Sequence, residues 1–252
     1  MHRYHRLGKL PKKRHMALRK PEGGIYYEEL KGNKGFVGPS SLLYHLHRPT
    51  AVVGTKLLRE VKLEEDPDQR LRMRHFFSGQ LKHGGSPVLD RTAIMFNNDV
   101  TLWMAFPDAE DEFYYRNAQA DEIVYVSDGS GTLETAFGEL PYSQGDYLVI
   151  PRGILHRYRF GKGEQRFFIT ESKGEVRTPK RYRNEYGQLI ERSPFSERDW
   201  RVPENLRTVD QQEPTAIIVK QRDLLTEVTL AHHPCDVVGW DGYYYPYAFS
   251  IH

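Results

Sequence analysis

The chain has 252 residues, of which 38% are hydrophobic, 28% charged and 12% aromatic, and its mean hydropathy is −0.67. This composition is typical of a globular protein with one large or two small domains, and it excludes a fibrous or wholly disordered chain. The sequence has no apolar run near the roughly 18 to 20 residues of a membrane-spanning helix, and its N-terminus is charged where a signal peptide is apolar. Its single cysteine, Cys235, cannot form an internal disulfide. We therefore expect a cytoplasmic protein with no membrane partner.

Residues 1–34 form a basic N-terminal arm in our interpretation. Met1 to Lys20 contain eight Lys or Arg and no acidic residue, which leaves 28 basic and 34 acidic residues, a net charge of −6, in the remainder. Apolar side chains are spread among the charges, so we expect the arm to lie on the protein's own body or on a neighbouring subunit. Binding to RNA or DNA is the weaker alternative, and we expect no nucleic-acid partner.

Residues 35–172 carry the pattern of a β domain. Short apolar runs separated by Gly, Pro, Asp or Asn predict strands within 40–46, 50–58, 92–106, 122–137, 145–151 and 166–172. Many short strands of this kind are typical of an antiparallel sandwich or barrel. The predicted fold is all-β, with few helices.

Residues 173–252 differ in character. Lys173 to Glu213 is rich in Pro, Arg, Glu and Asn with isolated aromatic residues, which predicts a long irregular excursion pinned by those aromatics. Residues 214–230 return to a strand-like AIIV followed by a short amphipathic stretch. The aromatic, strand-like residues 239–252 predict exposed apolar surface and poor solubility unless another chain covers them.

Residues 105–160 have the outline of the cupin signature, in which strands of a small β-barrel point metal ligands at its axis. Glu122 is separated by six residues from Gly129, and residues 145–156, GDYLVIPRGILH, reproduce the second half of the signature up to its histidine. Only Phe160 departs there, where Asn is usual. The frame predicts a cupin-like β-sandwich or barrel over residues 35–172.

The first half of the signature lacks the paired histidines that would bind a metal. The two permitted spacings put other residues in their places, either Tyr115 with Asn117 or Arg116 with Ala118. Glu122 and His156 alone give too few ligands for a tight site, so we expect them to be a hydrogen-bonded remnant at the barrel axis. The predicted β-sandwich therefore has no complete metal site.

The other histidines and Cys235 offer no convincing site. His45 and His47 would share one face of a strand but lack a supporting carboxylate, so we expect packing or interface roles for both. His232 and His233 are adjacent and would point oppositely on a strand. Cys235 is expected to be a small buried side chain. The acidic residues 108–112 are expected to form a solvated loop.

Several long segments resemble the bacterial branch of the homogentisate 1,2-dioxygenase family. They are residues 4–15, 26–50, 117–153, 178–199 and 233–252. The most specific is HPCDVVGWDGYYYPYAFSIH, because nothing in a generic cupin requires it. The resemblance covers most of the chain, and Cys235 departs from the family's usual Phe.

The resemblance implies an oxidoreductase that opens the ring of homogentisate with O2 in tyrosine and phenylalanine catabolism, with Fe(II) bound by two His and one carboxylate. It also implies a homo-oligomer, a trimer or hexamer. Family members continue past this chain's last segment into a second cupin barrel that carries the iron ligands. We therefore interpret the chain as a truncated N-terminal portion, structural and oligomerising, in which 173–252 also begins the segment leading to the missing barrel.

We assign no catalytic, cofactor-binding or metal-ligating residue in this chain. In particular, we do not assign such a role to Glu122, His156 or His252. Fe(II) is expected in the full-length family member and not in this chain alone, which we expect to be inactive by itself. The alternative is a non-catalytic cupin-like module that binds a small aromatic acid near Arg116, Glu122 and His156.

Overall fold

The computed structural model describes residues 3–252. In this part of the chain eighteen strands form three sheets, and the helices are three single turns of 3-10 helix, η1 (Ser78–Gln80), η2 (Lys180–Tyr182) and η3 (Glu197–Asp199). The prediction of an all-β fold with few helices is confirmed. No helix within residues 3–252 is long and apolar enough to cross a membrane.

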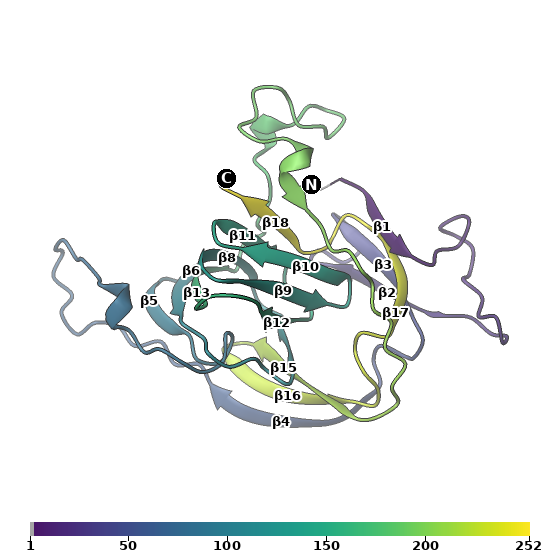
Figure 1. Cartoon of the computed structure of the whole chain (residues 1–252), viewed down its shortest axis with the longest axis horizontal. Coiled ribbons are helices and arrows are strands. Elements are labelled where there is room, and N and C mark those ends of the chain that lie inside the picture. Colours follow the sequence, from purple (N-terminus) through teal and green to yellow (C-terminus); the bar gives the residue numbers. More distant parts are fainter. Residues whose placement is uncertain (1–2) are drawn as a thin grey trace.

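The smallest sheet joins the two ends of the chain. Its four strands, in spatial order, are β1 (His5–Gly8), β17 (Val237–Gly242), β3 (Ser40–His45) and β2 (Tyr27–Gly32). All neighbours in it are antiparallel, and His5 lies opposite Gly242. The basic N-terminal segment is thus hydrogen-bonded to the last aromatic segment (Figure 1).

The second sheet, which we call the β7 sheet, has seven strands. In spatial order they are β10 (Gly138–Ser143), β9 (Ser130–Thr135), β12 (His156–Phe160), β7 (Tyr114–Asn117), β15 (Thr215–Gln221), β16 (Leu224–Leu230) and β4 (Val52–Glu60). The β7–β15 pair is parallel, and it places Lys220 opposite Asn117. Figure 1 shows β15, β16 and β4 curving together along one side of the molecule.

The third sheet, the β8 sheet, also has seven strands. In spatial order they are β14 (Trp200–Arg201), β18 (Tyr247–Ser250), β11 (Asp146–Ile150), β8 (Asp121–Asp128), β13 (Arg166–Ser172), β6 (Val100–Ala105) and β5 (Thr92–Phe96). β4, β10, β5 and β14 remain as sheet edges, so the fold is a sandwich whose sheets do not close into a barrel.

The main hydrophobic core lies between the two large sheets. Leu133 and Ile218 of the β7 sheet and Val124, Leu148 and Phe167 of the β8 sheet belong to one buried cluster. Successive residues of a strand point to opposite faces, so one face of each sheet faces this core. All three sheets contain strands from more than one of the segments 1–34, 35–172 and 173–252.

The prediction of an exposed aromatic C-terminal segment is wrong. Trp240 and Ala248 are fully buried, and Tyr244 and Tyr245 nearly so. The reason is that β17 pairs with β1 and β3, and β18 with β11 and β14, so upstream strands of the same chain cover these residues. Within residues 239–252 Ile251 is an exposed apolar side chain, at 54%. Larger groups of exposed apolar side chains lie on β4 and in the segment between β4 and β5, which extends from the body (Figure 1).

Candidate functional site

A buried polar network occupies the space between the two large sheets where the cupin frame points. Its members come from β7, β8, β13, β15 and the loop before β5, and they are Arg91, Tyr115, Asn117, Glu122, Glu171 and Lys220. Glu122 shares a strand face with Val124, and Glu171 shares one with Ile169, so the same alternation that buries the apolar side chains also buries these carboxylates.

Glu122 is neutralised by an arginine. Arg91 Nη1 lies 3.0 Å from Glu122 Oε2, and their side chains are only 6% and 1% exposed. The other carboxylate oxygen, Oε1, accepts hydrogen bonds from the Tyr115 hydroxyl at 3.3 Å and from Asn117 Nδ2 at 3.0 Å. Of the two spacings allowed by the sequence, the structure therefore selects the one that puts Tyr115 and Asn117 beside Glu122.

Glu171 forms the second half of the network. Lys220 Nζ donates to its two carboxylate oxygens at 2.7 and 2.6 Å, and Trp103 Nε1 donates to Oε2 at 3.0 Å. Asn117 Nδ2 joins the two halves, because it also donates to Glu171 Oε1 at 3.1 Å. The ammonium group of Lys220 lies 5.0 Å from the centre of the Trp103 ring, within cation–π distance.

The charges of Glu122 and Arg91 are fixed near neutral pH. Burial alone would raise the pKa of Glu122, but the guanidinium of Arg91 and the hydrogen bond from Asn117 hold it below its usual range. Burial disfavours the charged form of Arg91, yet Glu122 outweighs this and raises the pKa of the guanidinium. Burial lowers the pKa of His156, so its imidazole is neutral at pH 7.

The predicted hydrogen bond between Glu122 and His156 is wrong. His156 Nδ1 lies 3.1 Å from the carbonyl oxygen of Ile154, and Nε2 has no hydrogen-bond partner among residues 3–252. The physical reason is Arg91: a full positive charge beside Glu122 satisfies the carboxylate better than a neutral imidazole does. The His156 ring instead packs edge-on against Tyr115, with ring centres 5.4 Å apart.

The residues around Glu122 do not fit an iron ion. Fe(II) of the expected kind needs two imidazoles and a carboxylate on one side of the metal. Here Tyr115 and Asn117 stand where imidazoles would, and Arg91 places a cation at the carboxylate. Within residues 3–252 no three His, Cys, Asp or Glu side chains are placed to hold a metal ion.

The predicted cluster of Arg116, Glu122 and His156 is not formed. Arg116 follows Tyr115 on β7 and therefore points to the opposite face of the sheet. There it lines a different cavity, together with Glu29, Lys31 and His45.

The remaining candidate residues have structural partners. His45 Nδ1 lies 2.7 Å from Asp236 Oδ1, and its Nε2 lies 3.2 Å from Glu29 Oε2. The rings of His47 and His232 contact each other at 5.0 Å, whereas His45 is engaged elsewhere.

Cys235 and the acidic loop complete this group. Burial raises the pKa of the Cys235 thiol to about 12, as for an unreactive packed side chain. The prediction of a solvated loop over residues 108–112 is wrong at Asp111, which is 8% exposed.

Reasoning from the sequence missed Arg91, Glu171 and Lys220. Arg91 comes from a loop that precedes the cupin frame of residues 105–160, and Lys220 reaches the site only through the parallel pairing of β15 with β7. The one available hint was a charged residue at the end of each apolar strand run, RFFITE and AIIVK. A charge that continues the buried face of a strand needs a buried partner.

A family model described as homogentisate 1,2-dioxygenase N-terminal matches residues 88–251. A Saccharolobus solfataricus protein whose name calls it a dioxygenase is 41% identical over 250 residues, which cover 99% of this chain and 64% of that protein. The homogentisate 1,2-dioxygenase of Bradyrhizobium diazoefficiens is 32% identical over 147 residues, 56% of this chain and 30% of that enzyme. The chain thus spans less than two thirds of the length of either relative.

Among solved structures, a cupin-2 domain protein from Shewanella frigidimarina aligns with 22% identity and a TM-score of 0.32. The alignment covers 38% of this chain and 86% of that protein.

Proposed function

This chain belongs to the homogentisate 1,2-dioxygenase N-terminal family, and from this premise we propose that it is the structural N-terminal portion of an Fe(II)-dependent, ring-cleaving dioxygenase. The substrate class we propose is homogentisate or a close hydroxyphenyl relative, with O2 as co-substrate, as in tyrosine and phenylalanine catabolism. The family match over residues 88–251 carries this proposal.

We further propose that this chain supplies no iron ligand and has no turnover by itself. The support is the chemistry at Glu122, where Arg91 already neutralises the carboxylate and Tyr115 and Asn117 replace imidazoles. A metal ion at this position would lie next to the buried guanidinium of Arg91. If the ion took Glu122 from Arg91, the guanidinium would be left as an unpaired buried charge. Iron, when bound in such a dioxygenase, would bring substrate and O2 together on one centre.

The test is iron analysis and oxygen uptake on the purified 252-residue chain, loaded anaerobically with Fe(II) and then given homogentisate and air. We expect no stoichiometric iron and no oxygen consumption above the rate of the free ion. The matched sample is a fusion of this chain with the part of the Saccharolobus solfataricus relative that the chain does not cover, about a third of that protein. The fusion should bind iron and consume oxygen. Stoichiometric iron in the chain alone would contradict the ligand argument.

We also propose that the chain self-associates, as a trimer or hexamer. Supporting this, the edge strand β4 exposes Val52, Val53, Leu57 and Leu58, and an open apolar edge favours pairing with another chain. Light scattering on the purified chain should give a mass of three or six copies. A monomer at micromolar concentration would contradict this part of the proposal.

A further inference from the structure

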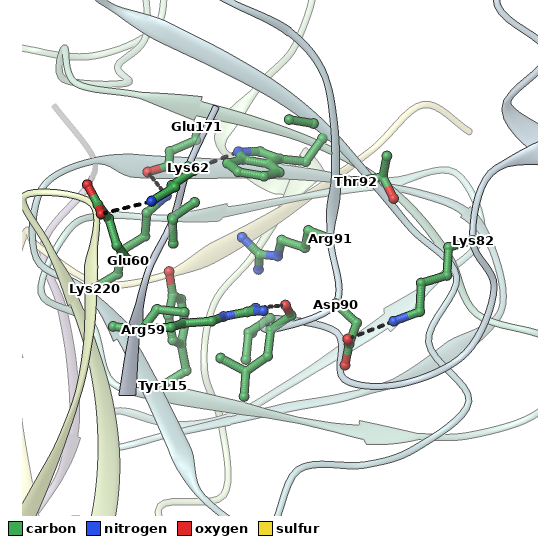
Figure 2. Close-up of a pocket in the computed structure, with 16 residues that line it drawn as sticks. Arg59, Glu60, Lys62, Lys82, Asp90, Arg91, Thr92, Tyr115, Glu171 and Lys220 are labelled. Atoms are coloured by element: carbon green, nitrogen blue, oxygen red, sulfur yellow. Dashed lines mark hydrogen bonds and ion pairs between the residues drawn. The ribbon is translucent and has the colours of Figure 1, made fainter. Parts of the chain in front are cut away.

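The cavity that Arg116 lines lies on the outer face of the β7 sheet and has a volume of about 220 Å³. Its lining comes from β2 and β3 of the four-stranded sheet, from β4, β7, β15 and β16 of the β7 sheet, and from loops between them. Tyr115 of β7 lines the space between the two large sheets (Figure 2), whereas Arg116, the next residue, points the other way. We call this space the Arg116 cavity. A cavity of about 150 Å³ holds a benzene molecule, so this one has room for six carbon atoms and a charged group.

Both carboxylates in the wall of the Arg116 cavity are already engaged. Lys31 Nζ lies 2.7 Å from one carboxylate oxygen of Glu29. His45 Nε2 lies 3.2 Å from the other oxygen of Glu29, and His45 Nδ1 lies 2.7 Å from Asp236 Oδ1. Lys31 and His45 thus satisfy the acids of the wall, and the charge that is left over is that of Arg116.

The guanidinium of Arg116 has no partner within residues 3–252. It forms no ion pair and no hydrogen bond there, and its Nε is buried without an acceptor. Nη1 and Nη2 stay accessible, since they are not among the buried unpartnered atoms, and they have no acceptor either. Burial lowers the pKa of Arg116, and the attraction of Glu29 offsets this only in part. An oxyanion is the group that such a guanidinium binds, because two oxygens fit the fork of its terminal N–H groups.

The wall next to Arg116 is aliphatic. The strand order β7-β15-β16 carries it away from the guanidinium, and β16 lies two strand spacings, about 9 to 10 Å, from β7. The aliphatic side chains on these strands and on the loop before β12 are Leu155, Ile217, Val228 and Leu230. A ligand that fits both parts of the wall has an anionic group at one end and a short apolar chain at the other.

We propose that the Arg116 cavity binds a monovalent carboxylate that carries a short aliphatic chain. The carboxylate accepts from the terminal N–H groups of Arg116, and the chain packs against Ile217 and Val228. A single negative charge matches the single guanidinium that is without a partner among the described residues of the wall. The proposal does not rest on the proposed dioxygenase function, because the cavity lies on the opposite face of the β7 sheet from the buried network and needs neither iron nor turnover.

The test is a calorimetric titration of the metal-free 252-residue chain with hexanoate. We expect saturable binding with a Kd below about 10 mM. Acetate has four CH2 groups fewer and should bind at least about tenfold more weakly, because burial of each CH2 group is worth up to about fourfold in Kd. Hexanamide has the chain without the charge and should also bind at least about tenfold more weakly.

These comparisons can also refute the proposal. Equal affinity for acetate and hexanoate would overturn the role of the aliphatic wall, and equal affinity for hexanamide would overturn the role of the charge. Inorganic phosphate that binds as tightly as hexanoate would show a general oxyanion site and would overturn the assignment to a carboxylate with an apolar chain.

Variants locate the site. Arg116→Gln should weaken hexanoate binding at least about tenfold. Val228→Phe fills the aliphatic part of the cavity and should also weaken binding at least about tenfold, and it decides the question if Arg116→Gln does not fold. Arg166→Gln is the matched control and should leave the Kd unchanged, because Arg166 is likewise half-buried without an ion pair in residues 3–252 but lines another cavity. No saturable binding by the native chain, or full affinity in Val228→Phe, would overturn the proposal.

Discussion

Glu122→Gln tests how much of the fold depends on the buried network. The substitution keeps the size of the side chain and an acceptor for Asn117 but removes the charge that faces Arg91 at 3.0 Å. Arg91 would then be a buried cation whose remaining partner is the Pro87 carbonyl oxygen. Removing one partner of a buried ion pair costs about 3 to 5 kcal/mol, a large part of the roughly 5 to 15 kcal/mol by which a domain is stable.

The assay is urea unfolding at pH 7 followed by tryptophan fluorescence, with the slope of the transition compared to confirm that the unfolded state is unchanged. Lys34→Gln is the matched control, because Lys34 is also paired, at 2.6 Å with Glu175, but its side chain is 47% exposed. Lys34→Gln should therefore lower the free energy of unfolding by less than about 1 kcal/mol.

A double substitution separates the pair from its parts. Arg91→Met combined with Glu122→Gln removes both charges, so it should cost less than the two single changes added together, by about 1 to 3 kcal/mol. If Glu122→Gln costs no more than Lys34→Gln, or if the two changes at Glu122 and Arg91 are additive, the network is not the ion pair described above.

Three further outcomes follow from buried groups and tight packing. Burial raises the pKa of Asp111 from 3.8 to about 6, so the folded state loses stability as the pH rises through this range. Asp111→Asn should remove this loss. Urea unfolding at pH 8 should show the variant to be more stable than the native chain by up to about 3 kcal/mol. Burial alone would lower the pKa of His45, but hydrogen bonds to Asp236 and Glu29 raise it above 6.5. The stability contributed by the imidazolium is therefore complete below pH 6.5 and is lost at higher pH. His45→Gln should make the melting temperature vary less with pH between pH 6 and 9, and an unchanged dependence would contradict this. Gly131→Ala would bring a methyl group to 2.1 Å from a backbone oxygen in β12, so calorimetry should show a melting temperature at least about 5 °C lower, whereas Gly79→Ala, with open space around it, should change little.

The all-β class could be predicted because most core strands carry apolar runs. β3, β6 and β13 lie within the predicted segments, β8 begins one residue before its segment, and β15 and the amphipathic stretch after it form a hairpin. β7 and β12 were missed because their sequences, YYRN and HRYRF, are aromatic and polar rather than aliphatic. Both strands are flanked by partners in the β7 sheet, so pairing and not local pattern makes them strands.

The candidate site was predictable only where neighbours in space are also neighbours in sequence. The cupin frame located Glu122 and His156 and offered Tyr115 with Asn117 as one of two alternatives. It could not supply Arg91 or Lys220, whose positions depend on long-range pairing and on a loop. His156 was predicted as the partner of Glu122 because nothing in the sequence indicated that Arg91 would reach Glu122 from that loop.

The pairing of β1 with β17 has a consequence for how the protein is made. A ribosome releases His5 early, but the strand that holds it, around Gly242, leaves the exit tunnel only after more than 200 further residues have been added. Until then β1 has no partner in its sheet. Its pairing requires closure of a loop of more than 200 residues, which slows folding. The unpaired β1 segment is therefore the region for which a chaperone or an early protease would compete during synthesis.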